Sequence, residues 1–218
     1  MRSLLMGVDS GTQPTKALVA NAKTGEALGA STAVYRLIPS LPSGAKEQHP
    51  WDWIIAKRKG IQAAMKAGKA RAGEVFSFGV SGQRHRFGPL DKSGGVIRPA
   101  KIWYNICTLD ECEEITSILG CAKQTIAAVG NTVLPGFIAT RSLWPKKHEP
   151  KNFARLATVV LPHDYLIFWL KDVHLMEYGD ASGKTPFDVR QRRRSRAMLE
   201  ATDASLPVKL PSIFGISA

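Results

Sequence analysis

The chain has 218 residues, of which 44% are hydrophobic and 22% charged, a balance typical of a globular protein that buries a core. Thirty lysines and arginines against eighteen acids give a net charge of +12, which predicts attraction to anions such as nucleotides or sugar phosphates. The first apolar stretch is short and closes on Asp9, so we expect no signal peptide and no membrane partner. Three cysteines without metal-binding or C-x-x-C spacing favour reduced thiols in a cytoplasmic protein.

The positive charge is densest at residues 190–196, of which five are arginine. No aromatic residue is interleaved there, although stacking aromatics are what single-strand nucleic-acid binders add to charge. The pattern favours a solvated loop leading into a helix, and nucleic-acid binding is the weaker alternative.

The first part of the chain predicts extended segments joined by polar turns. We expect strands over residues 3–9, 16–20 and 26–36. A helix is then expected from Pro50, which suits the first helical position, with Asp52 in its first turn. Apolar residues at helical spacing are expected to cover the sheet, namely Trp51, Ile54, Ile55, Ile61 and Met65.

The rest of the chain alternates predicted strands with predicted helices. Strands are expected over 74–81, 99–105 and 155–161, and a hairpin over 87–97. Helices are expected over 110–119, 139–148 and 164–170, the second of them shortened or kinked at Pro145. This order predicts an α/β fold with a mixed β-sheet flanked by helices.

The turn after the first strand, Asp9-Ser10-Gly11-Thr12, carries groups suited to an anion and its metal ion. Gly11 is free to take a positive φ and to let backbone N–H groups approach an anion closely. The carboxylate of Asp9, at a strand end, can hold Mg²⁺ or orient a hydroxyl. By itself, the motif favours a surface hairpin with an acid at its edge.

Polar residues also end two later predicted strands, at Gln83 and His85 and again at Asn105. Because α/β folds place ligands at strand ends beside a sheet crevice, we expect these side chains and Asp9 to share a site.

Seven segments in this order resemble the N-terminal half of the FGGY carbohydrate kinases, and most closely their xylulokinase branch. They are GVDSGTQPTKALV (7–19), EQHPWDW (47–53), GVSGQRH (79–85), VIRPAKIWYN (96–105), GNTVLPGF (130–137), HEPKNFARLATVVLPHDYL (148–166) and DASGKTPFDVRQRR (180–193). The resemblance implies an actin-like, ribonuclease-H-like fold. It also implies that residues 1–218 form the sugar-binding domain, without the ATP-binding domain that follows in the family.

The same resemblance assigns roles to individual residues. Asp9 would be the acid near Mg²⁺ and the transferring phosphoryl group, and Gly11 and Thr12 would form the phosphate-facing turn. Gln83 and His85 would face the sugar. For His85 the alternative is a histidine satisfied inside a turn.

Two further residues belong to matching segments. Trp103 would form an apolar wall near the sugar. The alternative is that it is an ordinary residue of the hydrophobic core. Asp180 would begin the family's D-A-S-G turn.

Several residues depart from the family's pattern. Pro14 removes a backbone donor from the first turn. Arg84 and Arg86 stand where the family shows Met and Gly, and an arginine in place of glycine is expected to block close backbone approach to the sugar. Asn105 and Cys107 replace an Asp and an Arg, which removes a charged pair. Lys184 replaces a Thr in the D-A-S-G-T turn.

The family's catalytic base, an Asp in a Gly-Gly-x-Asp-Asn segment of its C-terminal half, has no counterpart in this sequence. The parent reaction implied by the resemblance is transfer of the ATP γ-phosphoryl group to D-xylulose, with Mg²⁺ as cofactor. We expect the chain alone to be inactive, and to pair with a separate C-terminal half or a second copy. The alternative is a non-catalytic sugar-binding or regulatory module.

Overall fold

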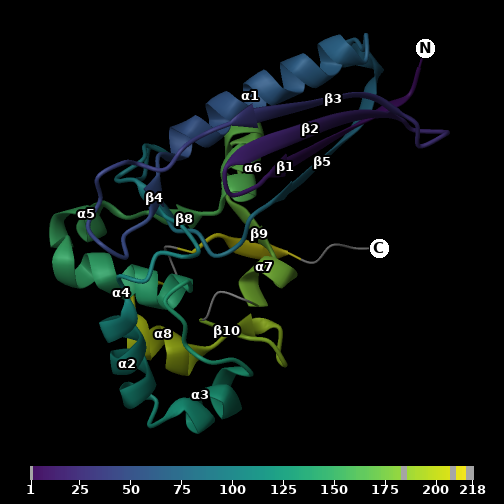
Figure 1. Cartoon of the computed structure of the whole chain (residues 1–218). Helices are drawn as coiled ribbons and strands as arrows, with labels where there is room; N and C mark the ends of the chain where they lie inside the picture. The colour runs from purple at the N-terminus through teal and green to yellow at the C-terminus, as the bar shows by residue number, and fades with distance from the viewer. Residues whose placement is uncertain (1, 183–185, 207–209, 215–218) are drawn as a thin grey trace.

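A computed structural model describes residues 2–182, 186–206 and 210–214 and shows a sheet with helices beside it and a group of helices at one end (Figure 1). The strands are β1 (Leu4–Ser10), β2 (Pro14–Asn21), β3 (Ala27–Val34), β4 (Glu47–Gln48), β5 (Val75–Gly82), β6 (Gly88–Leu90), β7 (Ala100–Lys101), β8 (Thr158–Val160), β9 (Leu175–Glu177), β10 (Phe187–Asp188), β11 (Arg193–Arg194) and β12 (Ser212–Phe214). The helices are α1 (Pro50–Ala67), the 3₁₀ helix η1 (Ala72–Glu74), α2 (Leu109–Ile118), α3 (Ala122–Val129), α4 (Ile138–His148), α5 (Pro150–Arg155), α6 (Pro162–Lys171), α7 (Tyr178–Ser182) and α8 (Arg196–Thr202).

The main sheet has the strand order β3-β2-β1-β5. Strands β1, β2 and β3 form an antiparallel meander, and β5 pairs in parallel with β1. The predicted mixed sheet is confirmed, with strand boundaries within a few residues of those expected for β1, β2, β3 and β5.

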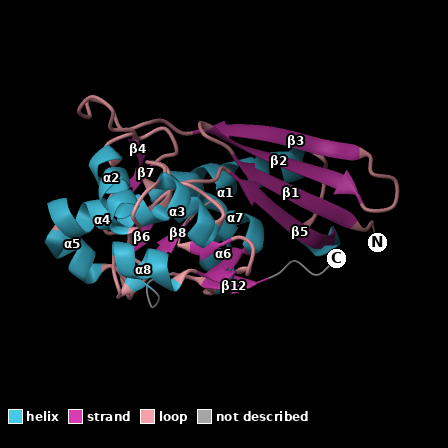
Figure 2. Ribbon diagram, turned by 90° about the horizontal axis from the view of Figure 1, so that it is seen from below, coloured by secondary structure: helices cyan, strands magenta, loops and turns pink. Residues whose placement is uncertain are grey.

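One face of this sheet forms the main core. Alternate residues of β1, including Leu4, Met6 and Val8, are buried and pack in one cluster with residues of α1 and α6. Period-two alternation places such residues on a single face, so the intervening residues of β1 lie on the other face. That second face is the open side of the sheet (Figure 2).

Helix α1 begins at Pro50 as predicted, with the His49 side chain accepting a bond from the Trp51 N–H at 3.3 Å. The predicted apolar face is partly wrong. Trp51 is 44% exposed, and Trp53 is fully buried instead. Lys57 is also fully buried, and its Nζ donates to the carbonyl of Pro162, the first residue of α6.

The helices α2, α3, α4 and α8 pack around a second cluster that contains Ile115, Val129, Leu143 and Met198. Neither α3 nor α5 was predicted. Helix α4 continues through Pro145 to His148, so the expected shortening is wrong, and Leu143 anchors it in this cluster.

The predicted hairpin over 87–97 is present in a short form: Leu90 and Val96 form an antiparallel bridge, and the Ile97 N–H donates to the Pro89 carbonyl at 3.0 Å. The main partner of β6 was not predicted, because β6 pairs with β8, nearly seventy residues later in the chain. Strand β7 is shorter than expected and pairs with β4. Both pairings are long-range, so local sequence carries no signal for them. No helix in the described part of the chain has the length and apolar character needed to cross a membrane.

Candidate functional site

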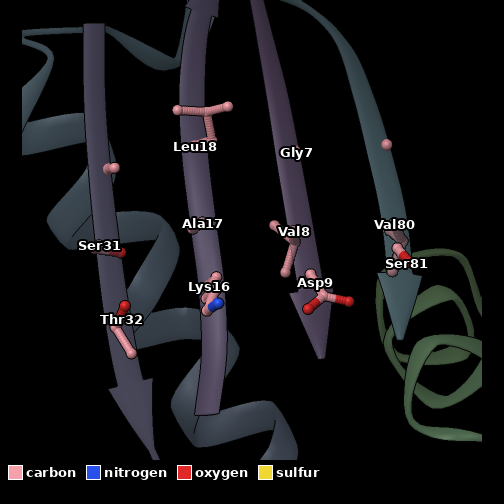
Figure 3. A pocket seen from close by; sticks show the side chains of 12 residues that line it. Gly7, Val8, Asp9, Lys16, Ala17, Leu18, Ser31, Thr32, Val80 and Ser81 are labelled. Carbon is pink, nitrogen blue, oxygen red and sulfur yellow. The ribbon is translucent and has the colours of Figure 1, made fainter. Parts of the chain in front are cut away.

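A row of polar side chains crosses the open face of the sheet near the ends of β1 and β5. The backbone register pairs Asp9 with Lys16 and with Ser81, and Lys16 with Thr32 (Figure 3). The Asp9 side chain is exposed on this face. A carboxylate, an ammonium group and two hydroxyls therefore stand side by side where β1 enters the first turn.

Side chains from other segments donate hydrogen bonds to the carbonyl groups of the turn after Asp9. The Gly11 carbonyl accepts bonds from the Tyr35 hydroxyl and from Nε2 of Gln83. The Thr12 carbonyl accepts a bond from Nε2 of Gln48 at 2.8 Å. None of the described residues accepts a bond from the N–H groups of Thr12 or Gln13, so these donors are available to an anion.

The conformation predicted for Gly11 is wrong, although a glycine still suits this position. It does not adopt a positive φ. A Cβ added at Gly11 would lie 3.1 Å from the carbonyl oxygen of Pro14, which accepts the Gly11 N–H at 2.9 Å. The glycine is needed for this close approach across the turn rather than for a left-handed backbone.

Arg86 points into the core, which corrects the expectation that its side chain blocks close backbone approach to a sugar. Its side chain is fully buried, lies over the Trp53 ring at 5.2 Å and bonds to Oε1 of Gln48. Its Nη2 lies 3.4 Å from the Thr12 carbonyl oxygen. Burial lowers the pKa of Arg86 to about 9. The guanidinium thus supports the turn from inside the core.

His85 lies on the other side of the same segment, with a φ of 56° and its ring stacked on Phe137 at 5.3 Å. The fully buried Arg141 fixes this region. It donates to the His85 and Lys101 carbonyls and, at 2.5 Å, to the Ile102 carbonyl. One guanidinium therefore ties together segments far apart in the sequence.

A hollow of about 290 Å³ opens beside these residues. Its lining includes His85, Trp103, Asn105, Ile106, Leu134 and Phe137. The Trp103 side chain is half exposed, and its Nε1 donates to Oγ1 of Thr12 at 3.2 Å. The hollow and the first turn are therefore direct neighbours.

Gln83 and Asn105, two other polar residues expected at the site, bond to the protein backbone. Gln83 donates to the Gly11 carbonyl and does not line the hollow. Asn105 is fully buried, donates to the Lys46 carbonyl at 3.2 Å and accepts the Cys107 N–H at 3.2 Å. The amide that replaces the expected acid is therefore satisfied without a charged partner.

Asp180 belongs to a buried cluster with His163 and Asp164. Nε2 of His163 bonds to the Asp180 carboxylate and lies 3.4 Å from the Asp164 carboxylate. Nε of Arg84 is 3.6 Å from Asp180. Gly183 and Lys184, the rest of the predicted D-A-S-G-T turn, lie outside the described residues.

The Asp9 position and the cluster at Asp180 offer different ligands to a metal ion. Mg²⁺ binds oxygen ligands, uses one or two carboxylates and keeps several waters, which fits the exposed Asp9 beside the Ser81 hydroxyl. The cluster at Asp180 is buried, contains an imidazole and is already closed by a direct hydrogen bond. The Asp9 position is the better fit for Mg²⁺.

Sequence reasoning missed Tyr35 and Arg141, which hold the turn and the hollow in place. No local sequence pattern identifies either residue, because each bonds to a segment distant in the sequence. Gln48 stands in a segment that resembles the family, but its role in supporting Thr12 was not predicted.

The N-terminal domain of the FGGY family of carbohydrate kinases matches residues 4–217. Xylulose kinase of Haemophilus influenzae is 32% identical over 216 residues, covering 96% of this chain and 44% of the relative. Xylulose kinase of Escherichia coli is 31% identical over 212 residues, covering 97% of this chain and 42% of the relative. A crystal structure described as a xyloylose kinase from Brucella ovis superposes with a TM-score of 0.88 and 30% identity, covering 97% of this chain and 43% of that structure.

The chain thus spans less than half the length of the relatives it matches. The structural neighbours are sugar kinases with the actin-like ATPase fold, which confirms the predicted fold class. Since a match to one family domain extends over nearly all of its residues, the chain belongs to the FGGY family of carbohydrate kinases, in the part that forms their N-terminal domain.

Proposed function

We propose that residues 1–218 form the sugar-binding part of an ATP-dependent kinase that phosphorylates D-xylulose or a related pentulose. The names of the full-length relatives support this substrate class. The single observation that carries the proposal is the hydrogen bond from Trp103 to Thr12, which joins the hollow to the anion-facing turn.

The hollow offers both kinds of contact that a sugar requires. Trp103, Ile106 and Phe137 supply apolar surface for the C–H groups of the sugar. The imidazole of His85 supplies a hydrogen-bonding group for a hydroxyl. Stacking on Phe137 holds the His85 ring in one orientation.

The turn supplies the groups for the phosphate side. The Thr12 and Gln13 N–H groups would bind phosphate oxygens, and Asp9 would hold Mg²⁺ through its carboxylate. When bound, Mg²⁺ with ATP supplies the phosphoryl group and neutralises the charge that develops on it. Lys16, beside Asp9, adds positive charge on the same face.

The chain alone is proposed to lack kinase turnover. The relatives are more than twice as long, and the resemblance puts the general base and most nucleotide contacts in their C-terminal part. A general base contributes about 10²–10⁴ in rate. Positioning of the nucleotide contributes up to roughly 7–11 kcal/mol, which Asp9 by itself cannot replace.

Calorimetry with D-xylulose tests the sugar site. We expect binding to the chain and at least about tenfold weaker binding to His85→Ala, as for loss of a hydrogen bond with its packing. His148→Ala, a half-exposed histidine on α4, is the matched control and should bind as the wild type does. Equal binding by all three proteins would exclude the hollow as the sugar site.

A coupled assay with ATP and D-xylulose tests the second part of the proposal. Turnover by the purified chain that Asp9→Ala abolishes would refute inactivity of the chain alone.

The altered sugar-facing segment supports a second candidate, a non-catalytic sugar-binding or regulatory module. Arg84, where the family shows Met, is exposed and pairs with Asp180. To separate the candidates, the chain is joined to the C-terminal part of E. coli xylulose kinase. Sugar binding without turnover in this fusion would favour the module, whereas turnover would favour the kinase.

A further inference from the structure

The hydrogen bond from Trp103 determines how the Thr12 hydroxyl group can bond further. An indole Nε1–H only donates, so it occupies one lone pair of the Thr12 oxygen, at 3.2 Å. A hydroxyl also has one proton of its own to donate. None of the described residues accepts that proton, so the Thr12 hydroxyl can donate it to a ligand.

The backbone that carries this hydroxyl is fixed by side chains from the core. The Thr12 carbonyl accepts a bond from Nε2 of Gln48 at 2.8 Å, and Nη2 of Arg86 lies 3.4 Å from the same oxygen. Gln48 and Arg86 are both fully buried. The Thr12 hydroxyl is therefore positioned before any ligand arrives, and a donor fixed in advance needs little reorganisation when it binds.

The backbone of Trp103 is fixed as well, although its side chain is 52% exposed. Trp103 lies in a turn that the Asn105 N–H closes by donating to the Ile102 carbonyl at 2.8 Å. Ile102 and Asn105 are both fully buried. The indole packs against the Tyr104 ring, with the two ring centroids 4.8 Å apart and their planes 71° from parallel. The bond to Thr12 thus joins two backbone segments that are each held in place.

The Thr12 hydroxyl stands beside two further donors of the same turn. The N–H groups of Thr12 and Gln13 are not bound by any of the described residues either. Neighbouring donors of this kind suit an anion with several oxygens, such as a phosphate group. A hydroxyl that already accepts one hydrogen bond donates a stronger one, because bonded groups polarise each other. The bond from Trp103 therefore strengthens the Thr12 hydroxyl as a donor to an anion.

We infer that Trp103 is a positioning residue for the phosphate group, in addition to being a wall of the hollow. Its indole N–H orients and polarises the Thr12 hydroxyl, which donates its proton to a phosphate oxygen at the turn. Trp103 acts on the phosphate only through Thr12. The inference rests on the proposed function for the placement of a phosphate group at this turn.

The same arrangement links the two parts of the candidate site. A sugar packed on the half-exposed Trp103 ring in the hollow holds the indole in the orientation that bonds to Thr12. The phosphate group then binds to a donor that is already ordered, so it binds more tightly. By thermodynamic linkage, the phosphate group raises the affinity for the sugar by the same factor.

A double-mutant cycle on Trp103 and Thr12 tests the inference, with inorganic pyrophosphate as the probe in calorimetry. We expect Thr12→Val to weaken pyrophosphate binding by at least about tenfold, as for loss of a hydrogen bond to a charged group. Trp103→Phe should weaken it by about 2- to 10-fold. In the Thr12→Val background, Trp103→Phe should have no further effect, because the hydroxyl through which it acts is absent.

The controls separate this effect from loss of structure and from non-specific attraction. Thr12→Ser keeps the hydroxyl and should retain most of the affinity of the wild type. Trp51→Phe, on the 44% exposed tryptophan of α1, is the matched control and should bind pyrophosphate as the wild type does. None of these substitutions alters the net charge of +12, so attraction of the probe to the basic surface is the same in every variant.

Three results of the cycle would overturn the inference: additive losses in the double variant, unchanged affinity in Trp103→Phe, or equal affinity in the wild type and Thr12→Val. With D-xylulose at saturation, the wild type should bind pyrophosphate about 2- to 10-fold more tightly, and Trp103→Phe should not. Unchanged pyrophosphate affinity with D-xylulose bound would disprove the link between the two parts of the site. Absence of D-xylulose binding beside a non-additive cycle would reject the proposed sugar and leave the role of Trp103 standing.

Discussion

The indole N–H of Trp103 donates to the Thr12 hydroxyl at 3.2 Å across a sequence separation of 91 residues. Thr12 belongs to the turn after β1 and Trp103 to the wall of the hollow. The bond therefore fixes the distance between the two halves of the candidate site, and it is the contact most specific to the proposed function.

Trp103→Phe keeps an aromatic wall but removes this donor. We expect D-xylulose affinity to fall by up to about 10-fold, because the aromatic ring is no longer held beside the turn by its bond to Thr12, a bond worth about 0.5–1.5 kcal/mol. The melting temperature should change little, because the side chain is half exposed. Trp51→Phe on α1 is the control and should leave calorimetric binding unchanged. A large loss of stability in Trp103→Phe would mark the residue as part of the core.

Arg86→Met tests whether Arg86 supports the turn from within. The change removes a buried guanidinium and leaves the Gln48 and Thr12 acceptors without one donor. We expect the free energy of unfolding in urea to fall by about 2–4 kcal/mol, since removing one member of a buried polar network leaves its partners unsatisfied. Arg84→Met is the matched control: its side chain is 59% exposed, and the expected loss is below about 1 kcal/mol. Equal losses in the two variants would contradict a supporting role.

Lys57 predicts an unusual pH dependence of stability. Burial lowers the pKa of its ammonium group to about 7 in the folded chain, against the opposing effect of Asp164. Between that value and the ordinary pKa of 10.5, the unfolded chain binds more protons, so stability rises with pH in this window.

The wild type should therefore gain up to roughly 1.4 kcal/mol per pH unit relative to Lys57→Met in urea unfolding between pH 7.5 and 9.5. Parallel pH profiles for the two proteins would show that the folded pKa of Lys57 is close to its ordinary value.

Gly29→Ala tests the close approach of β3 and α1. The added methyl group would lie 2.4 Å from the Ala64 carbonyl oxygen and 2.3 Å from the Gly68 nitrogen, so backbone must move. Overpacking of this kind costs typically about 1–3 kcal/mol or more. Gly7→Ala in β1, where the new methyl group meets open space, should be neutral or slightly stabilising by thermal denaturation. Similar melting temperatures for the two variants would contradict the close packing of this strand against the helix.

Some features of this protein were determined by its sequence alone. Local alternation and glycine turns were sufficient for β1, β2, β3, β5 and α1, because each of these elements is long and strongly patterned. The resemblance of ordered segments identified the family, and it placed Thr12, His85 and Trp103 among the candidate site residues, which the structure brings together at one turn and one hollow.

Only the tertiary structure showed which buried side chains support that site. Arg86 was expected to obstruct the sugar, and the fold instead turns it inward beneath Thr12. Lys57 and Arg141 are both fully buried and bond to carbonyls of distant segments. Which way a long cationic side chain turns depends on acceptors supplied from elsewhere in the fold. Sequence periodicity contains no information about those acceptors.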